Sequence, residues 1–166
     1  ANESYDFYGQ HLTVSGRYQY QWTPAGMDCD SLVSLDLEIR KIWYVREGGY
    51  GTRDGSSWDN AMANPNDALT AASSFQTEAS KQIWVAAGTY AGDGYSGQAF
   101  RLVPNVEIYG GFTGEESEQF DISDRDISAS PTILDGSHSQ RVVGNYGIEN
   151  SFGPTARGYI DGFVIQ

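Results

Sequence analysis

The stretch Ile83-Trp84-Val85-Ala86 is the first of four short apolar segments that decide the fold. The other three recur further along the chain: Val106-Glu107-Ile108-Tyr109, Thr132-Ile133-Leu134 and Phe163-Val164-Ile165. Their starts are separated by 23, 26 and 31 residues. A unit of this size, built from short strands and turns, is typical of a solenoid, in which each coil stacks on the previous one. The alternative is a β-sandwich, but its turns come about every 8 to 12 residues.

A helix is predicted ahead of these segments. The sequence Asn64-Pro65-Asn66-Asp67 favours a helix start, because Asn or Asp caps the first turn and acidic charge is stabilised at the positive end of the helix dipole. Apolar residues then recur along one face at helical spacing: Ala68, Leu69, Ala72, Phe75 and Ala79. We expect a helix of about four turns over residues 66–80. It would cap the first coil, whose strand edges are otherwise open.

Residues 1–40 predict a separate small antiparallel β module with strands over residues 5–8, 15–22 and 32–39. The second strand alternates Tyr18, Tyr20 and Trp22 with polar residues, which is the period of a half-buried strand. Three such strands bury too little apolar surface to be comfortable alone. The second organisation covers residues 41–166. It opens with a strand over residues 42–45 and a glycine-rich loop, and it holds two weaker strand candidates, 99–103 and 141–143.

Composition limits the partners. The 166 residues contain 22 Asp and Glu against 10 Lys and Arg, which gives a formal net charge of −12. A surface this negative repels phosphate backbones, so we expect no nucleic-acid partner. No apolar run approaches the roughly 18 residues that cross a bilayer, so we expect no transmembrane segment.

Cys29 is the single cysteine and has no internal disulfide partner. Few lysines, 20 glycines and 11 tyrosines suit a secreted β protein.

The motifs between residues 42 and 166 resemble, as an ordered series, the N-terminal part of secreted bacterial right-handed parallel β-helix proteins of the pectin-lyase-like superfamily. The series consists of Ile42-Trp43-Tyr44-Val45, Gly55-Ser56-Ser57-Trp58-Asp59-Asn60-Ala61, residues 82–90, residues 106–114, Asp124-Arg125-Asp126, residues 131–136 and residues 160–165. Residues 1–40, with Cys29-Asp30-Ser31 ahead of an alternating strand, resemble the latter part of an Ig-like repeat of bacterial surface proteins. In those repeats a second cysteine typically lies just upstream of the first strand, and this chain lacks it.

The resemblance implies an all-β fold, an extracellular or cell-surface location and frequent contact with polysaccharide. It does not imply one activity, because lyases, hydrolases, adhesins and structural stalks share the fold. We expect a non-catalytic N-terminal segment of a large surface protein that binds polysaccharide or mediates adhesion. The alternative is the front end of a polysaccharide lyase or glycoside hydrolase with its active site downstream. A stalk that binds a protein partner is the third class. Because Ile165-Gln166 lie in an apolar strand pattern, we expect further chain or a neighbouring molecule to cover that end.

Three aromatic residues in glycine-rich segments are the predicted ligand-binding residues: Trp58, Tyr50 and Tyr95. Exposed rings of this kind stack on sugars, whereas the alternative is packing beneath the loops. Trp43 and Trp84, in contrast, occupy strand positions and are predicted to lie in the core.

Acidic residues crowd between Glu115 and Asp126, and calcium is the one cofactor that the sequence suggests. Asp121, Asp124 and Asp126 are the predicted ligands, because calcium prefers carboxylate oxygens. No EF-hand spacing is present, so a solvated loop is the alternative.

No catalytic residue is predicted within the chain. Asp135 and Asp161 lie about one coil apart and could stack, but each precedes a glycine, where a turn explains it. His11 and His138 are far apart and have no nucleophile partner at a suitable spacing.

Overall fold

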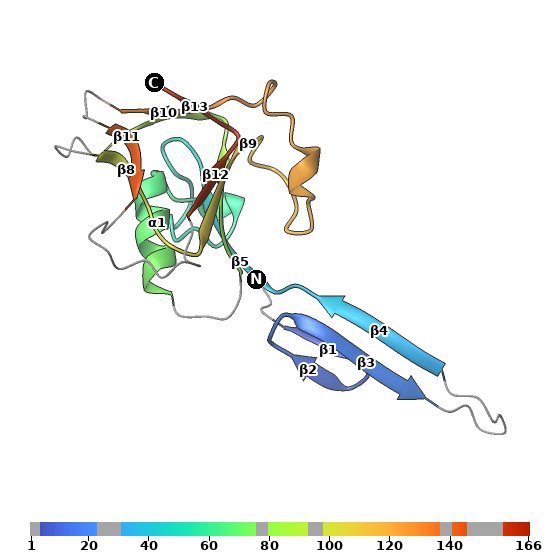
Figure 1. The fold of residues 1–166 in the computed structure, drawn as a ribbon. Helices are drawn as coiled ribbons and strands as arrows, with labels where there is room; N and C mark the ends of the chain where they lie inside the picture. Colours follow the sequence, from blue (N-terminus) through green and yellow to red (C-terminus); the bar gives the residue numbers. More distant parts are fainter. Residues whose placement is uncertain (1–3, 23–30, 76–79, 93–97, 137–140, 146–157) are drawn as a thin grey trace. The chain divides into compact units, whose positions relative to one another are not determined.

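The computed structural model describes residues 4–22, 31–75, 80–92, 98–136, 141–145 and 158–166 (Figure 1). Contacts divide the chain into two compact units, which are residues 1–41 with 77–80 and residues 42–76 with 81–166. We call them unit 1 and unit 2. Both are mostly strands, as the sequence predicts. No helix within the described ranges has the length and apolarity to cross a lipid bilayer.

Unit 1 consists of two antiparallel strand pairs. Strand β1 (Tyr5–Phe7) pairs with β2 (Gln10–Leu12), and β3 (Gly16–Trp22) pairs with β4 (Ser31–Leu37). The antiparallel arrangement is confirmed, whereas β2 was not predicted as a strand. Its pairing with β1 requires a tight turn, in which Tyr8 and Gly9 both have positive φ, 48° and 82°.

The aromatic face of β3 is only partly covered. Tyr18 and Tyr20 are half-buried opposite Leu35 and Val33, but Trp22 is 55% exposed. A two-stranded sheet has few neighbours with which to cover such a face. The Ig-like character of residues 1–40 stays a prediction, and Cys29 lies outside the described residues.

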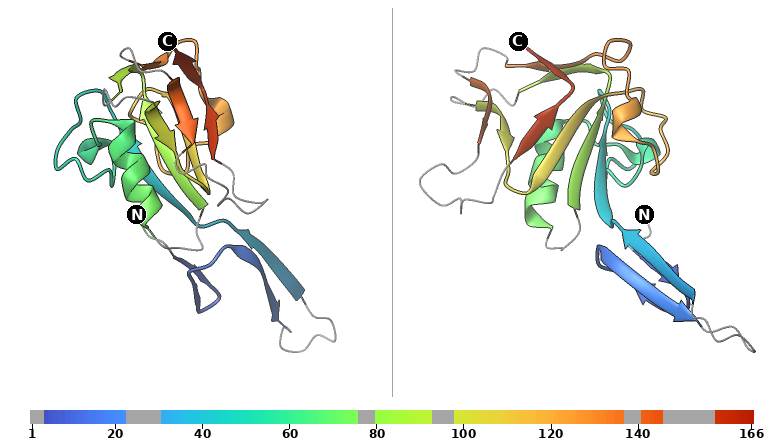
Figure 2. Two further views of the ribbon diagram at one scale, coloured as in Figure 1. Left: turned by 60° about the vertical axis from the view of Figure 1, so that its left-hand side comes forward. Right: turned by 45° about the vertical axis from the view of Figure 1, so that its right-hand side comes forward.

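Unit 2 is built from parallel sheets. Its strands are β5 (Arg40–Val45), β6 (Ser80–Ala86), β7 (Gly88–Ala91), β8 (Gln98–Leu102), β9 (Val106–Phe112), β10 (Thr132–Asp135), β11 (Arg141–Asn145), β12 (Tyr159–Asp161) and β13 (Phe163–Ile165). Within the described ranges they form sheet 1 (order β12-β9-β6-β5), sheet 2 (β13-β10-β7) and sheet 3 (β11-β8). Figure 2 shows the strands of sheet 1 side by side.

The chain visits these sheets in a fixed rotation. From β6 onward the strands fall in sheets 1, 2, 3, 1, 2, 3, 1 and 2. Every strand pair between β6 and β13 is parallel, from β6 with β9 to β10 with β13. Parallel neighbours need long connections, and here each connection runs through the other two sheets. The antiparallel pairing of a β-sandwich is therefore absent from these described strands.

The structure corrects how the four apolar segments stack. They were predicted to form one series, but β6 and β9 belong to sheet 1, while β10 and β13 belong to sheet 2. The spacing in sequence is similar because residues 113–131 make the single step from β9 to β10 about as long as a full coil. The equivalent step from β6 to β7 contains Ala87 alone. Strand β7 was not predicted, because Tyr90 is its only fully buried residue.

Helix α1 (Pro65–Ser74) begins as predicted and ends early. The Asn64 side chain caps it by accepting a hydrogen bond from the Asn66 N–H at 2.8 Å, and Pro65 occupies the first turn. Ala68, Leu69 and Ala72 are buried against the sheets, and the helix contacts β8 and β9. The predicted extent of 66–80 is wrong, since Ser80 already begins β6. The predicted face residue Ala79 lies outside the described residues.

The second parts of β5, β6 and β9 in sheet 1 are buried on both faces. Trp43, Val45, Ile83 and Val85 point to a core shared with α1 and the other sheets. Tyr44, Trp84 and Phe112 alternate with them and form a second cluster on the opposite face. There the Trp84 ring stacks on the Phe112 ring with centroids 4.7 Å apart. The predicted core positions of Trp43 and Trp84 are confirmed, at 5% and 0% exposure.

Thr132 links two sheets. Its buried hydroxyl accepts a hydrogen bond from the Gly111 N–H of β9 at 2.8 Å, and the carbonyl oxygens of Val85 and Ala86 in β6 lie 3.4 and 3.3 Å away.

We expect Thr132→Val to lower the free energy of unfolding by about 1–3 kcal/mol, because the Gly111 N–H loses its partner. Urea unfolding followed by tryptophan fluorescence measures this loss.

Thr89→Val is the matched control. Thr89 lies on the neighbouring strand β7 and is exposed, so the same substitution should change the unfolding free energy by no more than about 0.5 kcal/mol. Equal losses in the two variants would contradict the bridging role of Thr132.

Candidate functional site

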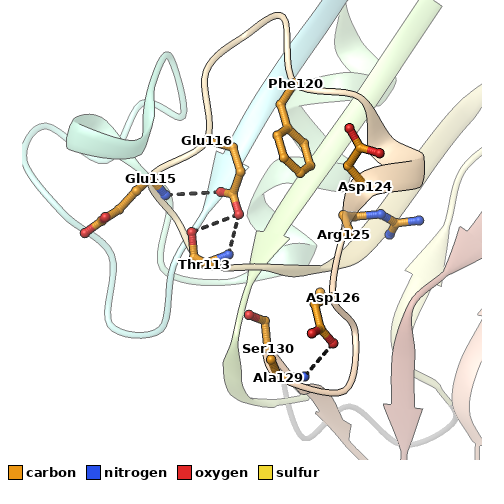
Figure 3. A pocket seen from close by; sticks show the side chains of 10 residues that line it. Thr113, Glu115, Glu116, Phe120, Asp124, Arg125, Asp126, Ala129 and Ser130 are labelled. Carbon is orange, nitrogen blue, oxygen red and sulfur yellow. Dashed lines mark hydrogen bonds between the residues drawn. The ribbon is translucent and has the colours of Figure 1, made fainter.

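The connection between β9 and β10 contains a hollow of about 400 Å³, which we call the loop pocket (Figure 3). It is bordered by Gly111 near the end of β9 and by residues from two stretches, 113–116 and 120–130. The second stretch includes the short 3-10 helix η2 (Ile122–Asp124). Phe120 and Ile122 of this connection pack on the Trp84–Phe112 cluster. The pocket is therefore part of the layer that covers the second face of sheet 1.

Arg125 fixes one wall of the pocket. Its side chain is only 6% exposed and donates three hydrogen bonds, from Nε to the Ile122 carbonyl at 2.7 Å, from Nη1 to the Gly110 carbonyl at 2.6 Å and from Nη2 to the Asp161 carboxylate at 2.6 Å. The last two bonds tie the loop to β9 and β12. Gly162 leaves the space for them, since a Cβ at this position would lie 2.6 Å from the Gly110 carbonyl oxygen.

The Glu116 carboxylate fixes the opposite wall. It accepts hydrogen bonds from the Thr113 N–H and hydroxyl and from the N–H groups of Gly114 and Glu115, at 2.6 to 3.1 Å. Burial acts to raise the pKa of this carboxyl, but these donors outweigh burial and lower the pKa below its ordinary value. Glu116 is therefore an anion at neutral pH and a structural part of its own loop.

Phe120 and Ser130 both line the hollow and are drawn toward opposite ends of it in Figure 3. Phe120 is half-buried, and its edge contacts the Phe112 ring with centroids 6.2 Å apart. Ser130 is only 7% exposed, and its N–H donates to the Asp126 carbonyl oxygen. Its hydroxyl makes no hydrogen bond to the part of the chain that the structure describes. A buried hydroxyl without a partner is costly, so a group that enters the pocket gains a hydrogen bond here.

The predicted calcium ligands are not brought together. Asp121 accepts hydrogen bonds from the N–H and hydroxyl of Ser123 and so caps η2. The Asp126 carboxylate accepts one from the Ala129 N–H at 3.0 Å. Asp124 and Asp126 both line the pocket. Among the described residues, no group of three or more His, Cys, Asp or Glu side chains is arranged to hold a metal ion. Calcium stays a prediction that this geometry does not support.

The predicted ligand aromatics have three different outcomes. The expectation that Trp58 is exposed is wrong, because the residue is 7% exposed in the 3-10 helix η1 (Trp58–Asn60). Its indole packs edge-on against Tyr44 and donates a hydrogen bond from Nε1 to the Glu116 carbonyl at 3.0 Å. Tyr50 is 58% exposed, with the Arg46 guanidinium 5.8 Å from its ring centroid. Its ligand role stays a prediction, and Tyr95 lies outside the described residues.

Among the described residues, Asp135, Asp161 and His11 do not come together in one site. Asp135 pairs with Ala91 in sheet 2, whereas Asp161 pairs with Tyr109 in sheet 1 and binds Arg125. The two carboxylates therefore do not stack. His11 is exposed and hydrogen-bonds Asp6 in unit 1, and His138 lies outside the described residues.

The acidity of Glu116 provides a test of this loop geometry. Because its pKa in the folded protein is lowered, its contribution to stability is present above the ordinary carboxyl range and is lost as pH falls through the folded pKa. We expect Glu116→Gln to be less stable than the wild type at neutral pH and to approach it in acid. Urea unfolding at a series of pH values measures the difference.

Glu115→Gln is the control for this series, because the Glu115 carboxylate accepts no hydrogen bond from the described residues. Its stability should follow that of the wild type at each pH. A destabilisation of Glu116→Gln that does not change with pH would contradict the role given to the carboxylate charge.

The loop pocket thus combines an aromatic ring, a buried hydroxyl and carboxylates on walls that Arg125 and Glu116 hold in place. Sequence reasoning identified the acidic stretch but not Phe120 or Ser130. Comparisons of the chain with protein-family models, curated proteins and solved structures found no match.

Proposed function

We propose that this chain is a non-catalytic segment of a secreted or cell-surface protein. In this proposal unit 2 forms the first coils of a right-handed parallel β-helix, and the loop pocket binds polysaccharide. The rotation of the chain through three parallel sheets supports the β-helix, because each set of three strands corresponds to one coil. Helix α1 contacts β8 of the earliest coil, which suits the capping element that a solenoid needs at its first end.

The observation that carries the binding proposal is that Phe120 and Ser130 line one open hollow, in which the Ser130 hydroxyl has no hydrogen-bond partner among the described residues. A sugar ring has an apolar face, which packs on an aromatic ring, and hydroxyl groups at its edge, which donate and accept hydrogen bonds. The volume of about 400 Å³ lies within the range of small-molecule pockets. The carboxylates of Asp124 and Asp126 add acceptors for sugar hydroxyls.

Two of the charged side chains in the walls, Arg125 and Glu116, are poorly suited to catalysis. Elimination needs a base that is free to take a proton, and glycoside hydrolysis needs a carboxylic acid whose pKa is raised. The Arg125 guanidinium is held by three acceptors, and the pKa of Glu116 is lowered rather than raised. Both groups therefore act as fixed parts of the wall.

The test is a glycan array with the wild-type chain, followed by titration of a bound oligosaccharide against Phe120→Leu, Ser130→Ala and Tyr50→Leu. We expect Phe120→Leu to weaken binding about three- to tenfold, since an aromatic contact contributes about 0.5–1.5 kcal/mol. Ser130→Ala should weaken it by a similar factor, since one hydrogen bond contributes about as much. Tyr50→Leu is the matched control, because this exposed ring lies outside the pocket.

Two outcomes would contradict the proposal. One is an array on which the chain binds no glycan. The other is loss of binding in Tyr50→Leu with none in Phe120→Leu or Ser130→Ala, which would place the site at the glycine-rich loop instead. Release of shortened sugars during the titration would favour the alternative function of a lyase or hydrolase.

A further inference from the structure

The loop pocket carries an excess of negative charge. Among the described residues, four acidic side chains line it, Glu115, Glu116, Asp124 and Asp126, against one cation, Arg125. Arg125 does not neutralise them, because its guanidinium is paired with Asp161 at 2.6 Å, and Asp161 does not border the hollow. Glu116 is compensated by the donors of its own loop. A ligand in the pocket therefore meets the negative charge of the other three carboxylates, Glu115, Asp124 and Asp126.

Asp124 is the carboxylate best placed to act on a ligand. It makes no side-chain hydrogen bond within the described residues, and it is exposed beside Phe120 (Figure 3). Asp126 lies on the other side of the hollow, next to Ser130. A cation beside Asp124 would therefore meet this one carboxylate and the neighbouring Phe120 ring, and both attract positive charge.

An acidic lining alone would not identify a ligand, but Ser130 gives a second and independent indication. Ser130 is 7% exposed and borders the pocket, and its hydroxyl lacks a partner among the described residues. A bare metal ion does not fit this set, because the carboxylates are not arranged as a metal cluster. A ligand that carries both hydroxyl groups and a positive charge fits the carboxylates, the Phe120 ring and the Ser130 hydroxyl. The net charge of −12 in turn disfavours acidic sugars.

We propose that the loop pocket selects saccharides that carry a free ammonium group, of the glucosamine type, over their neutral and acidic counterparts. The ammonium group lies between Asp124 and the Phe120 ring, and the sugar hydroxyls hydrogen-bond to Ser130 and Asp126. This inference rests on the proposed function, because it names the class of sugar that the same pocket takes.

The test compares two ligands that differ at the nitrogen alone. The β-1,4-linked glucosamine tetramer and its N-acetylated counterpart have the same rings and linkages, but only the first is cationic. Calorimetric titration of the whole chain should show about tenfold tighter binding of the glucosamine tetramer at low salt. The preference should shrink as ionic strength rises from about 0.01 to about 1 M, since the screening length falls from about 30 to about 3 Å.

Asp124→Asn should reduce this preference about two- to fivefold, while binding of the acetylated tetramer changes little. Asp59→Asn is the matched control, because it removes one charge from an exposed residue of η1 outside the pocket. Neither side chain makes a hydrogen bond within the described part of the chain, so neither variant should lose stability.

Each contrary outcome has a distinct meaning. If both tetramers bind equally and Phe120→Leu weakens both, the ammonium inference is wrong and the proposed saccharide binding stands. If a tetralysine peptide binds as tightly as the glucosamine tetramer, the pocket recognises charge rather than sugar, and the inference is also wrong. If no saccharide binds at all, the proposed function fails and this inference fails with it.

Discussion

Parallel strand pairing is the constraint on which the rest of unit 2 depends. Two neighbouring parallel strands cannot be joined by a tight turn, so the chain must leave the sheet and come back to the same edge. In unit 2 the detour from β6 to β9 runs through β7 and β8, and each of these starts a further parallel sheet. The core between the sheets fills with strand residues such as Ile83, Ile108 and Leu134. The corners between strands are then free to carry insertions without disturbing this core.

The insertion over residues 113–131, between β9 and β10, has a structural task and contains the loop pocket. It covers the outer face of sheet 1, where Trp84 and Phe112 would otherwise expose a large aromatic surface. Arg125 holds it in place through β9 and β12, and Glu116 organises its first turn. Such a loop on a rigid scaffold is where binding sites commonly occur. The hollow belongs to this insertion, since all of its lining residues except Gly111 come from residues 113–130.

Local patterns predicted much of the secondary structure, because strand alternation and helix capping are properties of neighbouring residues. They indicated the apolar strands, the start of α1 at Asn64 and the buried positions of Trp43 and Trp84. They did not show which strands share a sheet, because connections of different length separate the strands that occupy equivalent positions in successive coils. Trp58 was misassigned for a similar reason. Its glycine-rich surroundings indicated exposure, but the Glu116 carbonyl that accepts its indole hydrogen bond lies 58 residues away. The pairing of Phe120 with Ser130 also depends on the folded loop. An aromatic residue inside an acidic run was its only local signal.

Backbone proton contacts measured by NMR test the parallel scaffold most directly. In sheet 2 the account predicts that Ile133 lies beside Val164 and that Leu134 lies beside Ile165. In sheet 3 it predicts that Val143 lies beside Phe100. Contacts between these residues, with the pattern of parallel strands, would support the three sheets and the loop pocket built on them. Contacts that place Leu134 opposite Phe163 would show antiparallel pairing and would contradict the account.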